Sequence, residues 1–473
     1  MKFIMIAAAL AMASAGFSNV EDRLMELETN SQLNPLRFGA EFMTRVDTHD
    51  TEVFNATTGK MDSETFLVHR MRFRLNMEAN PTPKLSFYAR ISGSKLMSRF
   101  TRAGTDYPVG IFNEEQWGRN FRGSALHFER AFFNYKLHDK LTLSVGRLPT
   151  IEGGPEHLTY GSSPLGTYPL LAYGSVMDGY ALTTGFGDVT IRGIYHPLMT
   201  LHFGDENDTL TKTKSKIANY PDVNDIYVGM IDYSKRRLGF ARSLNFVLQY
   251  LTFKDSAISD APGASGTYSS LKMGYDSSVL YAELTGIAKT GLNLALTYHA
   301  TTLYSDGNLI ALDPAVVEAG VRAGGVTNQA AIDAAVAGAI AAAPVMGFLT
   351  DKTSGKTSGS AQQVVISYKI PSSALKRPTV GLELFSSDQN YMYFDFASLN
   401  LPNMHAVRGG KSMHLFYVQP LDTNLKLRIG MITKERVYSE GLGFGKIRKL
   451  SEATGGKEYA DDTSMYLDFN MTI

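Results

Sequence analysis

Apolar and polar residues alternate along most of this chain, and the alternation is sharpest between residues 70 and 77. One side of this segment is apolar and the other carries three guanidinium groups: Met71, Phe73, Leu75 and Met77 against Arg70, Arg72, Arg74 and Asn76. Successive side chains of a β-strand point to opposite faces. Burying three unpaired arginines in a protein core would cost several kcal/mol each, so we expect the arginine side to face water. Apolar residues against lipid and arginines around a hydrated interior are typical of a transmembrane barrel strand.

The same period of two recurs from Leu36 to the last residue. Further segments with one apolar and one polar side lie at residues 36–43, 85–92, 189–196, 244–250, 292–298, 425–431 and 464–473. Each is about as long as a tilted strand that crosses a bilayer. The pattern predicts an all-β fold, a transmembrane antiparallel up-and-down β-barrel over residues 35–473.

The connections between these segments alternate between tight turns and long loops, as they do in outer-membrane barrels. The clearest tight turns are Asn80-Pro81-Thr82-Pro83, His138-Asp139-Lys140, Phe186-Gly187-Asp188 and Asp422-Thr423-Asn424. The pattern yields about seventeen segments, whereas single-chain bacterial barrels have an even number of strands, so we expect about 16 or 18. The two counts differ at residues 268–302, where both Asp276-Ser277 and Lys289-Thr290 are typical of tight turns.

The residues before the barrel predict export. Lys2 is followed by an apolar run over residues 3–12 and a small-residue triplet at 13–15, which predicts a cleaved signal peptide at 1–15. Residues 16–34 predict a short periplasmic helix, or a brief coiled coil between subunits, because three apolar residues have helical spacing: Val20, Leu24 and Leu27. With a barrel downstream, the expected location is the outer membrane of a Gram-negative bacterium.

The loop at residues 305–362 is predicted to be helical. Asp313-Pro314 begins one helix, Gly324-Gly325 ends it, and Thr327 caps a second that runs to Pro344. The second helix is rich in alanine but contains a charged residue, so we do not expect it to span the membrane. The two helices either cap the pore or stand outside it, and we favour the second arrangement slightly.

Charge and composition exclude several classes of function. Lys and Arg number 46, Asp and Glu also number 46, and cysteine is absent, so no global field attracts nucleic acid and no disulfide or lipid-anchored amino terminus is expected. The ten histidines lack metal-ligand spacing, and no Ser-His-Asp order or phosphate-binding glycine loop is present. We therefore expect no catalytic residues, no metal and no cofactor, and an outer-membrane hydrolase is a less favoured alternative.

One hairpin links the chain to a known group of proteins. Residues 130–137 (RAFFNYKL) and 141–147 (LTLSVGR) flank a tight turn and end in Gly-Arg before a long loop. This hairpin resembles that of bacterial outer-membrane porins, and the whole mature chain resembles a porin-like family of unassigned function. One departure is the final residue, Ile473, where porins usually end on an aromatic residue. The resemblance implies a passive diffusion channel for small hydrophilic solutes, embedded in outer-membrane lipid as a homotrimer.

The inward faces of the predicted strands are rich in bases. The pore-lining candidates are Arg37, Arg45, Arg70, Arg72, Arg74, Arg90, Arg192, Lys426 and Arg428, with Glu41, Asp47, Glu383 and Asp468 as the clearest inward acids. Most of these bases lie on the first three strands and the penultimate one, which become neighbours when the barrel closes. A basic wall of this kind would favour anions. Alternatively, the arginines pair with the acids and give a rigid lumen of little selectivity. Both interpretations expect a polar interior.

The loop at residues 149–178 follows the Gly-Arg of the hairpin, and the porin resemblance implies that it folds inward as a constriction. The candidate constriction residues are Arg147, Glu152, Glu156, His157, Tyr160, Tyr168 and Tyr173. The other interpretation is an ordinary surface loop. A third possibility for the whole protein is an adhesin, or a surface-binding barrel that uses its long outer loops.

Overall fold

The computed structural model describes most of the predicted barrel. Its described residues are 36–55, 58–96, 126–162, 166–172, 177–197, 225–259, 270–305, 314–342, 356–392, 404–405, 407, 409–438 and 457–473. The predicted signal peptide at 1–15 and the predicted helix at 16–34 lie outside these residues.

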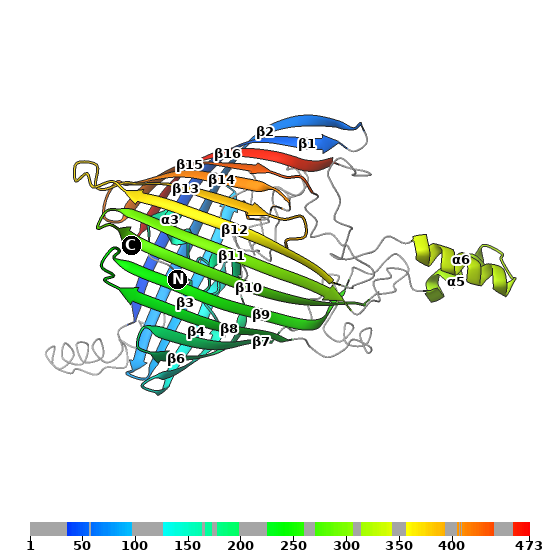
Figure 1. Ribbon diagram of the computed structural model, residues 1–473, viewed down its shortest axis with the longest axis horizontal. Coiled ribbons are helices and arrows are strands. Elements are labelled where there is room, and N and C mark those ends of the chain that lie inside the picture. The colour runs from blue at the N-terminus through cyan, green and yellow to red at the C-terminus, as the bar shows by residue number, and fades with distance from the viewer. Residues whose placement is uncertain are drawn as a thin grey trace, which may run out of the picture.

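Sixteen antiparallel strands close into one barrel (Figure 1). Each strand pairs with its neighbours in the sequence, and β1 closes the barrel by pairing with β16. The strands are β1 Arg37–Asn55, β2 Lys60–Thr82, β3 Leu85–Leu96, β4 His127–His138, β5 Leu141–Arg147, β6 Asp178–Phe186, β7 Val189–Pro197, β8 Asp225–Arg236, β9 Ser243–Ser259, β10 Ser270–Ile287, β11 Leu292–Ser305, β12 Lys356–Lys369, β13 Thr379–Ser387, β14 Lys411–Pro420, β15 Leu425–Glu435 and β16 Lys457–Thr472. The predicted up-and-down barrel is confirmed, and the strand number is sixteen.

The turn predicted at Asp276-Ser277 is wrong, because β10 runs through it without a break. Both side chains bond to neighbouring strands instead. The Tyr250 hydroxyl donates to Oδ1 of Asp276 at 2.9 Å, and Ser277 Oγ lies 2.8 Å from Nε2 of His299 on β11. Residues typical of turns were therefore placed within a strand by cross-strand hydrogen bonds, which local sequence does not reveal.

Apart from the turn between β1 and β2, the short turns lie at one end of the barrel, together with the C-terminus (Figure 1, left). At the other end, helices α5 (Pro314–Ala323) and α6 (Gln329–Ala342) stand apart from the strands (Figure 1, right). Asn328, rather than the predicted Thr327, caps α6: its Oδ1 accepts the backbone N–H groups of Ala330 and Ala331 at 2.9 and 3.3 Å. No helix among the described residues is long and apolar enough to cross a membrane.

The outer face of the barrel is apolar. Phe38, Phe73 and Leu280 are exposed there, whereas Arg70 and Arg74, which alternate with Phe73 on β2, are almost fully buried. The alternation read from the sequence thus separates a lipid-facing surface from an inward surface in the closed barrel.

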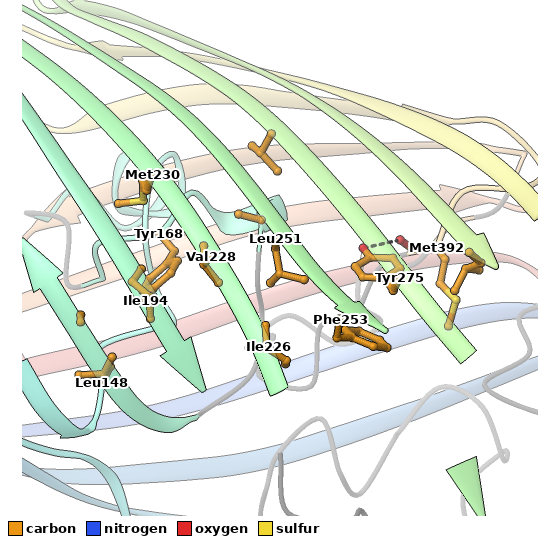
Figure 2. Packing of buried hydrophobic residues seen from close by; sticks show 14 of the residues in the cluster. Leu148, Tyr168, Ile194, Ile226, Val228, Met230, Leu251, Phe253, Tyr275 and Met392 are labelled. Atoms are coloured by element: carbon orange, nitrogen blue, oxygen red, sulfur yellow. Dashed lines mark hydrogen bonds between the residues drawn. The ribbon is translucent and has the colours of Figure 1, made fainter. Parts of the chain in front are cut away.

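The inner face is not polar throughout, so the prediction of a polar interior is wrong for one half of the barrel. Strands β7 to β10 point apolar side chains inward, among them Ile194, Val228, Leu251 and Tyr275, and these pack against Tyr168 (Figure 2). These side chains form an apolar core inside the barrel. The polar half lies opposite, on β1 to β3, β15 and β16.

Two segments fold into the lumen and supply the partners for this core. The first, which we call the inward loop, is formed by the described residues between β5 and β6 and contains α3 (Glu156–Tyr160) and the 3-10 turn η1 (Leu170–Ala172). The second comprises residues 388–392, 404–405 and 407, after β13. Tyr275 donates its hydroxyl hydrogen to the carbonyl of Met392 in this second segment (Figure 2). Apolar packing therefore holds both segments against the barrel wall.

Candidate functional site

The polar half of the lumen is built from arginines that pair with carboxylates. We call this group the arginine–carboxylate cluster, and its members are Arg45, Arg70, Arg72, Arg74, Arg90, Arg428, Glu41, Asp47, Glu129, Glu152 and Asp468. Strand register brings them together: Glu41 lies opposite Arg74, Arg45 lies opposite Arg70, and Arg428 lies opposite Asp468. Opposite charges therefore meet directly at Glu41–Arg74 and Arg428–Asp468, whereas the like charges of Arg45 and Arg70 both contact Asp47.

Arg74 lies at the centre of the cluster. Its guanidinium contacts three carboxylates: Glu41 on β1, Glu129 on β4 and Glu152 in the inward loop. All four side chains are largely buried, Arg74 at 2% exposure. One base thus joins two strands to the loop, and ion pairs of this kind, buried and hydrogen-bonded, are costly to break by removing one partner.

A second part of the cluster lies where the barrel closes. Asp47 Oδ1 accepts from Nε of Arg45 at 2.7 Å, and Asp47 Oδ2 accepts from Nε of Arg70 at 3.0 Å. Asp468 Oδ2 accepts both Nε and Nη2 of Arg428, at 2.9 and 2.5 Å. Across the seam itself, Arg45 Nη1 on β1 lies 4.0 Å from Asp468 Oδ2 on β16, so an ion pair adds to the backbone pairing of these strands.

Glu152 ties the inward loop to the barrel wall. Its carboxylate contacts Arg72, Arg74 and Arg90 at 3.3, 2.5 and 3.1 Å. Its backbone adopts a φ of 63°, a left-handed conformation that costs a non-glycine residue of order 1–3 kcal/mol. Burial alone would raise the pKa of the carboxyl group, but Arg74, Arg72 and Arg90 together hold that pKa well below its usual range. The ion pairs offset the backbone strain at this residue.

Helix α3 of the inward loop contacts two further parts of the barrel wall. The Arg428 guanidinium lies 3.7 Å from the centre of the Tyr160 ring, and Lys426 Nζ donates to the carbonyl of Gly161 at 2.7 Å. On the opposite wall, Nε2 of His157 lies 3.2 Å from a carboxylate oxygen of Glu283 on β10. The inward loop is therefore attached to both sides of the barrel. Burial raises the pKa of the Tyr160 hydroxyl, which stays protonated.

A polar cavity of about 180 Å³ remains between the inward loop and the wall. It is lined mainly by charged residues, and the described ones include Arg72, Arg74, Lys426 and Arg428 with Glu41, Glu152, Glu156 and Asp468. Tyr160, His157, Ser162 and Asn470 add further polar groups. Four bases and four acids of the lining thus face one small space.

Most of the predicted pore-lining residues lie in or beside this site, and three predicted residues do not. Arg37 is exposed at the first residue of β1. Arg192 points inward but pairs with Asp232 on β8, beside the apolar half of the lumen. Arg147 pairs with the exposed Asp178 on the outer side of β6. Its prediction as a constriction residue is wrong, because strand alternation turns it away from the lumen.

Within the inward loop, the predicted residues have different environments. Glu152, Glu156, His157 and Tyr160 line the cavity. Tyr168 is buried in the apolar core instead, and burial raises the pKa of its hydroxyl. Tyr173 lies outside the described residues.

A second polar group in the lumen surrounds Glu383, which was predicted to face inward, but sequence reasoning missed the two histidines that contact it. His405 of the second inward segment contacts Glu383 at 2.7 Å, and His414 on β14 contacts the other oxygen of Glu383 at 3.3 Å. His414 also lies 2.8 Å from the hydroxyl of Tyr466. Within the described part of the chain, no group of three or more His, Asp or Glu side chains is arranged to hold a metal ion.

Comparison with protein families gives one match. Residues 62–194 match the family described as "Protein of unknown function (DUF3373)". The matched range runs from β2 to β7 and contains the hairpin at 130–147. This part of the chain is thus similar to a family without assigned function, as the sequence resemblance predicted. No curated protein matches the sequence significantly.

Comparison with solved structures finds bacterial porins. OprB from Pseudomonas putida matches with a TM-score of 0.50 at 10% identity, covering 94% of this chain and 96% of that one. The anion-selective porin from Comamonas acidovorans has a TM-score of 0.46 at 12% identity, with 92% and 100% coverage. OmpF from Salmonella typhi has a TM-score of 0.44 at 10% identity, with 93% and 97% coverage. At these identities the likeness concerns the fold, and the predicted resemblance to outer-membrane porins is confirmed at that level.

Proposed function

We propose that this protein is a narrow diffusion channel for small hydrophilic solutes in the outer membrane of a Gram-negative bacterium. The observation that carries the proposal is the charged cavity between the inward loop and the strands β1, β2, β15 and β16. A lumen that served structure alone would be filled with apolar side chains on both halves, as it is on β7 to β10. Solutes move down their own gradient through this polar half.

The proposed passage is small. The apolar core and the two inward segments occupy much of the barrel, so solutes the size of inorganic ions and small carboxylates should pass better than sugars. Liposome swelling with a series of solutes of increasing size tests this. The proposal fails if the reconstituted protein gives no swelling above empty liposomes with any solute and no current in a planar bilayer.

We propose that the preference for anions is weak. Six guanidinium groups and five carboxylates make up the arginine–carboxylate cluster, so its formal charge is only +1. Paired charges cancel at distances beyond a few ångströms, and the remaining field is small. Reversal potentials under a salt gradient in a planar bilayer should show a modest anion preference, and a cation-selective wild type would contradict it.

A surface-binding role remains the second candidate. Helices α5 and α6 stand apart from the barrel at the end opposite the short turns (Figure 1), where a partner could reach them. Conductance separates the two functions, because an adhesin with a filled lumen gives none. From the porin resemblance we also propose that the protein is a homotrimer. The mass of the detergent-solubilised protein tests this.

A further inference from the structure

The polar cavity offers more hydrogen-bond donors than acceptors. Each guanidinium has five N–H groups, whereas a carboxylate has about four acceptor positions and no donor. Three of the four carboxylates of the lining are already in use: Glu152 accepts from three arginines, and Asp468 Oδ2 accepts two bonds from Arg428. Glu41 accepts from Arg74 and Arg90 as well as from an amide. The excess in this cavity is therefore on the donor side.

Two of the surplus donors can be named. Nη1 of Arg428 is buried and has no hydrogen-bond partner among the described residues, although the Arg428 side chain is 97% buried. The buried hydroxyl of Tyr160 likewise has no partner in the described part of the chain. Both side chains line the cavity. Buried polar atoms nearly always have partners in folded proteins, so these donors point to an acceptor that the protein itself does not supply.

We propose that the cavity binds one small oxyanion of the phosphate or sulfate type, held by the Arg428 guanidinium and the Tyr160 hydroxyl. The planar guanidinium matches the spacing of two oxygens on a tetrahedral anion. Arg72 and Lys426 supply further positive charge around the same space. The cavity has about 180 Å³, and one water molecule needs only about 10–15 Å³ of such space, so the ion fits with part of its hydration shell.

A cation fits this cavity less well. Glu41, Glu152 and Asp468 are engaged by arginines, so a cation would have to displace those guanidinium groups. An oxyanion would instead accept hydrogen bonds from donors that already point into the cavity. This inference rests on the proposed channel for its role, because a bound oxyanion would slow the passage of other anions. The binding itself is a property of the folded barrel.

The test is isothermal titration of the full-length protein, folded in detergent, with inorganic phosphate and, separately, with sulfate at constant ionic strength. Wild-type protein should show saturable binding at one site. Tyr160→Phe keeps the ring over Arg428 but removes the hydroxyl, so affinity should fall about tenfold, the effect of one hydrogen bond to a charged group. Tyr466→Phe is the matched control, because the Tyr466 hydroxyl bonds to His414 and does not line the cavity. Its affinity should stay within about twofold of wild type.

Two results would overturn the inference: no saturable heat with either anion, or equal affinities for Tyr160→Phe and Tyr466→Phe. A second measurement covers the case in which Tyr160→Phe does not fold. Phosphate added to wild-type channels carrying chloride should reduce the current with a saturable dose dependence, and a strictly linear dependence would contradict the site. The two proposals can fail separately. If the protein binds phosphate in detergent but carries no current, the channel proposal is wrong and the oxyanion site stands.

Discussion

The guanidinium carbon of Arg428 lies 3.7 Å from the centre of the Tyr160 ring. Arg428 belongs to β15 and Tyr160 to α3, so this contact joins the barrel wall to the segment that crosses the lumen. Tyr466 extends the column: its ring centre lies 5.1 Å from the guanidinium carbon of Arg428 and 3.8 Å from that of Arg45 on β1. The inward loop is thus anchored at the seam where the barrel closes.

Truncation of Tyr160 should loosen this anchor. Tyr160→Ala removes a cation–π contact that is worth about 1–2 kcal/mol when desolvated and also the packing of the ring. The stability of the detergent-folded protein should therefore fall by at least that amount, and the mean conductance should rise. Thermal unfolding and single-channel recording measure the two effects. Tyr298→Ala, which removes a lipid-facing tyrosine on β11, is the control and should leave conductance unchanged. Equal conductance in all three proteins would refute the anchoring role.

Neutralising Glu152 should have a larger effect on both stability and selectivity. Glu152→Gln removes the carboxylate that Arg72, Arg74 and Arg90 share. Leaving buried charge uncompensated costs about 3–5 kcal/mol of folding stability. The lumen also gains one positive charge, so the reversal potential should move toward the value expected for a purely anion-selective channel. Asp178→Asn removes a carboxylate on the outer side of the barrel and should not move it. If both variants give the wild-type reversal potential, Glu152 does not contribute to selectivity.

The contribution of Glu152 to stability should depend on pH in a defined direction. Because its folded pKa lies well below the value of about 4.3 for an unperturbed glutamate, the ionised form stabilises the fold above that pH, and this contribution is lost as the pH falls below it. The stability difference between wild type and Glu152→Gln should therefore be constant from about pH 8 to 5 and shrink below about pH 4. Chemical unfolding at several pH values measures it. A difference that already declines between pH 8 and 6 would show that another group is responsible.

The barrel could be predicted from sequence because one local property, alternation, determines which side of each strand meets lipid. Phe73 and Arg74 face opposite sides for this reason alone. The strand number required more than alternation. Asp276 and Ser277 have the composition of a turn, yet bonds to Tyr250 and His299 on neighbouring strands keep them within β10.

The site could be predicted only in part. Alternation identified Arg70, Arg72 and Arg74 as inward, together with Glu41 and Asp47, but it did not show which charges pair. Glu129 on β4 was missed, and the contact of Glu152 with Arg74 depends on how a loop folds. The apolar half of the lumen was missed because inward apolar residues such as Met230 pack against segments distant in sequence. A cluster of large apolar residues in an outer loop, here Tyr391 and Met392, is the signal that would have indicated a second inward segment.

Close backbone packing within the inward loop gives a final prediction. A Cβ atom at Gly153 would lie 1.5 Å from the carbonyl oxygen of Tyr168, and that oxygen belongs to the backbone, so the loop itself would have to move. Gly153→Ala should therefore displace Glu152 from its arginines, lower the thermal stability and change the conductance. Gly193→Ala on β7 is the matched control, because a Cβ there meets nothing within 4 Å, and it should behave as wild type. If Gly153→Ala retains wild-type stability and conductance, the inward loop is not held by this packing.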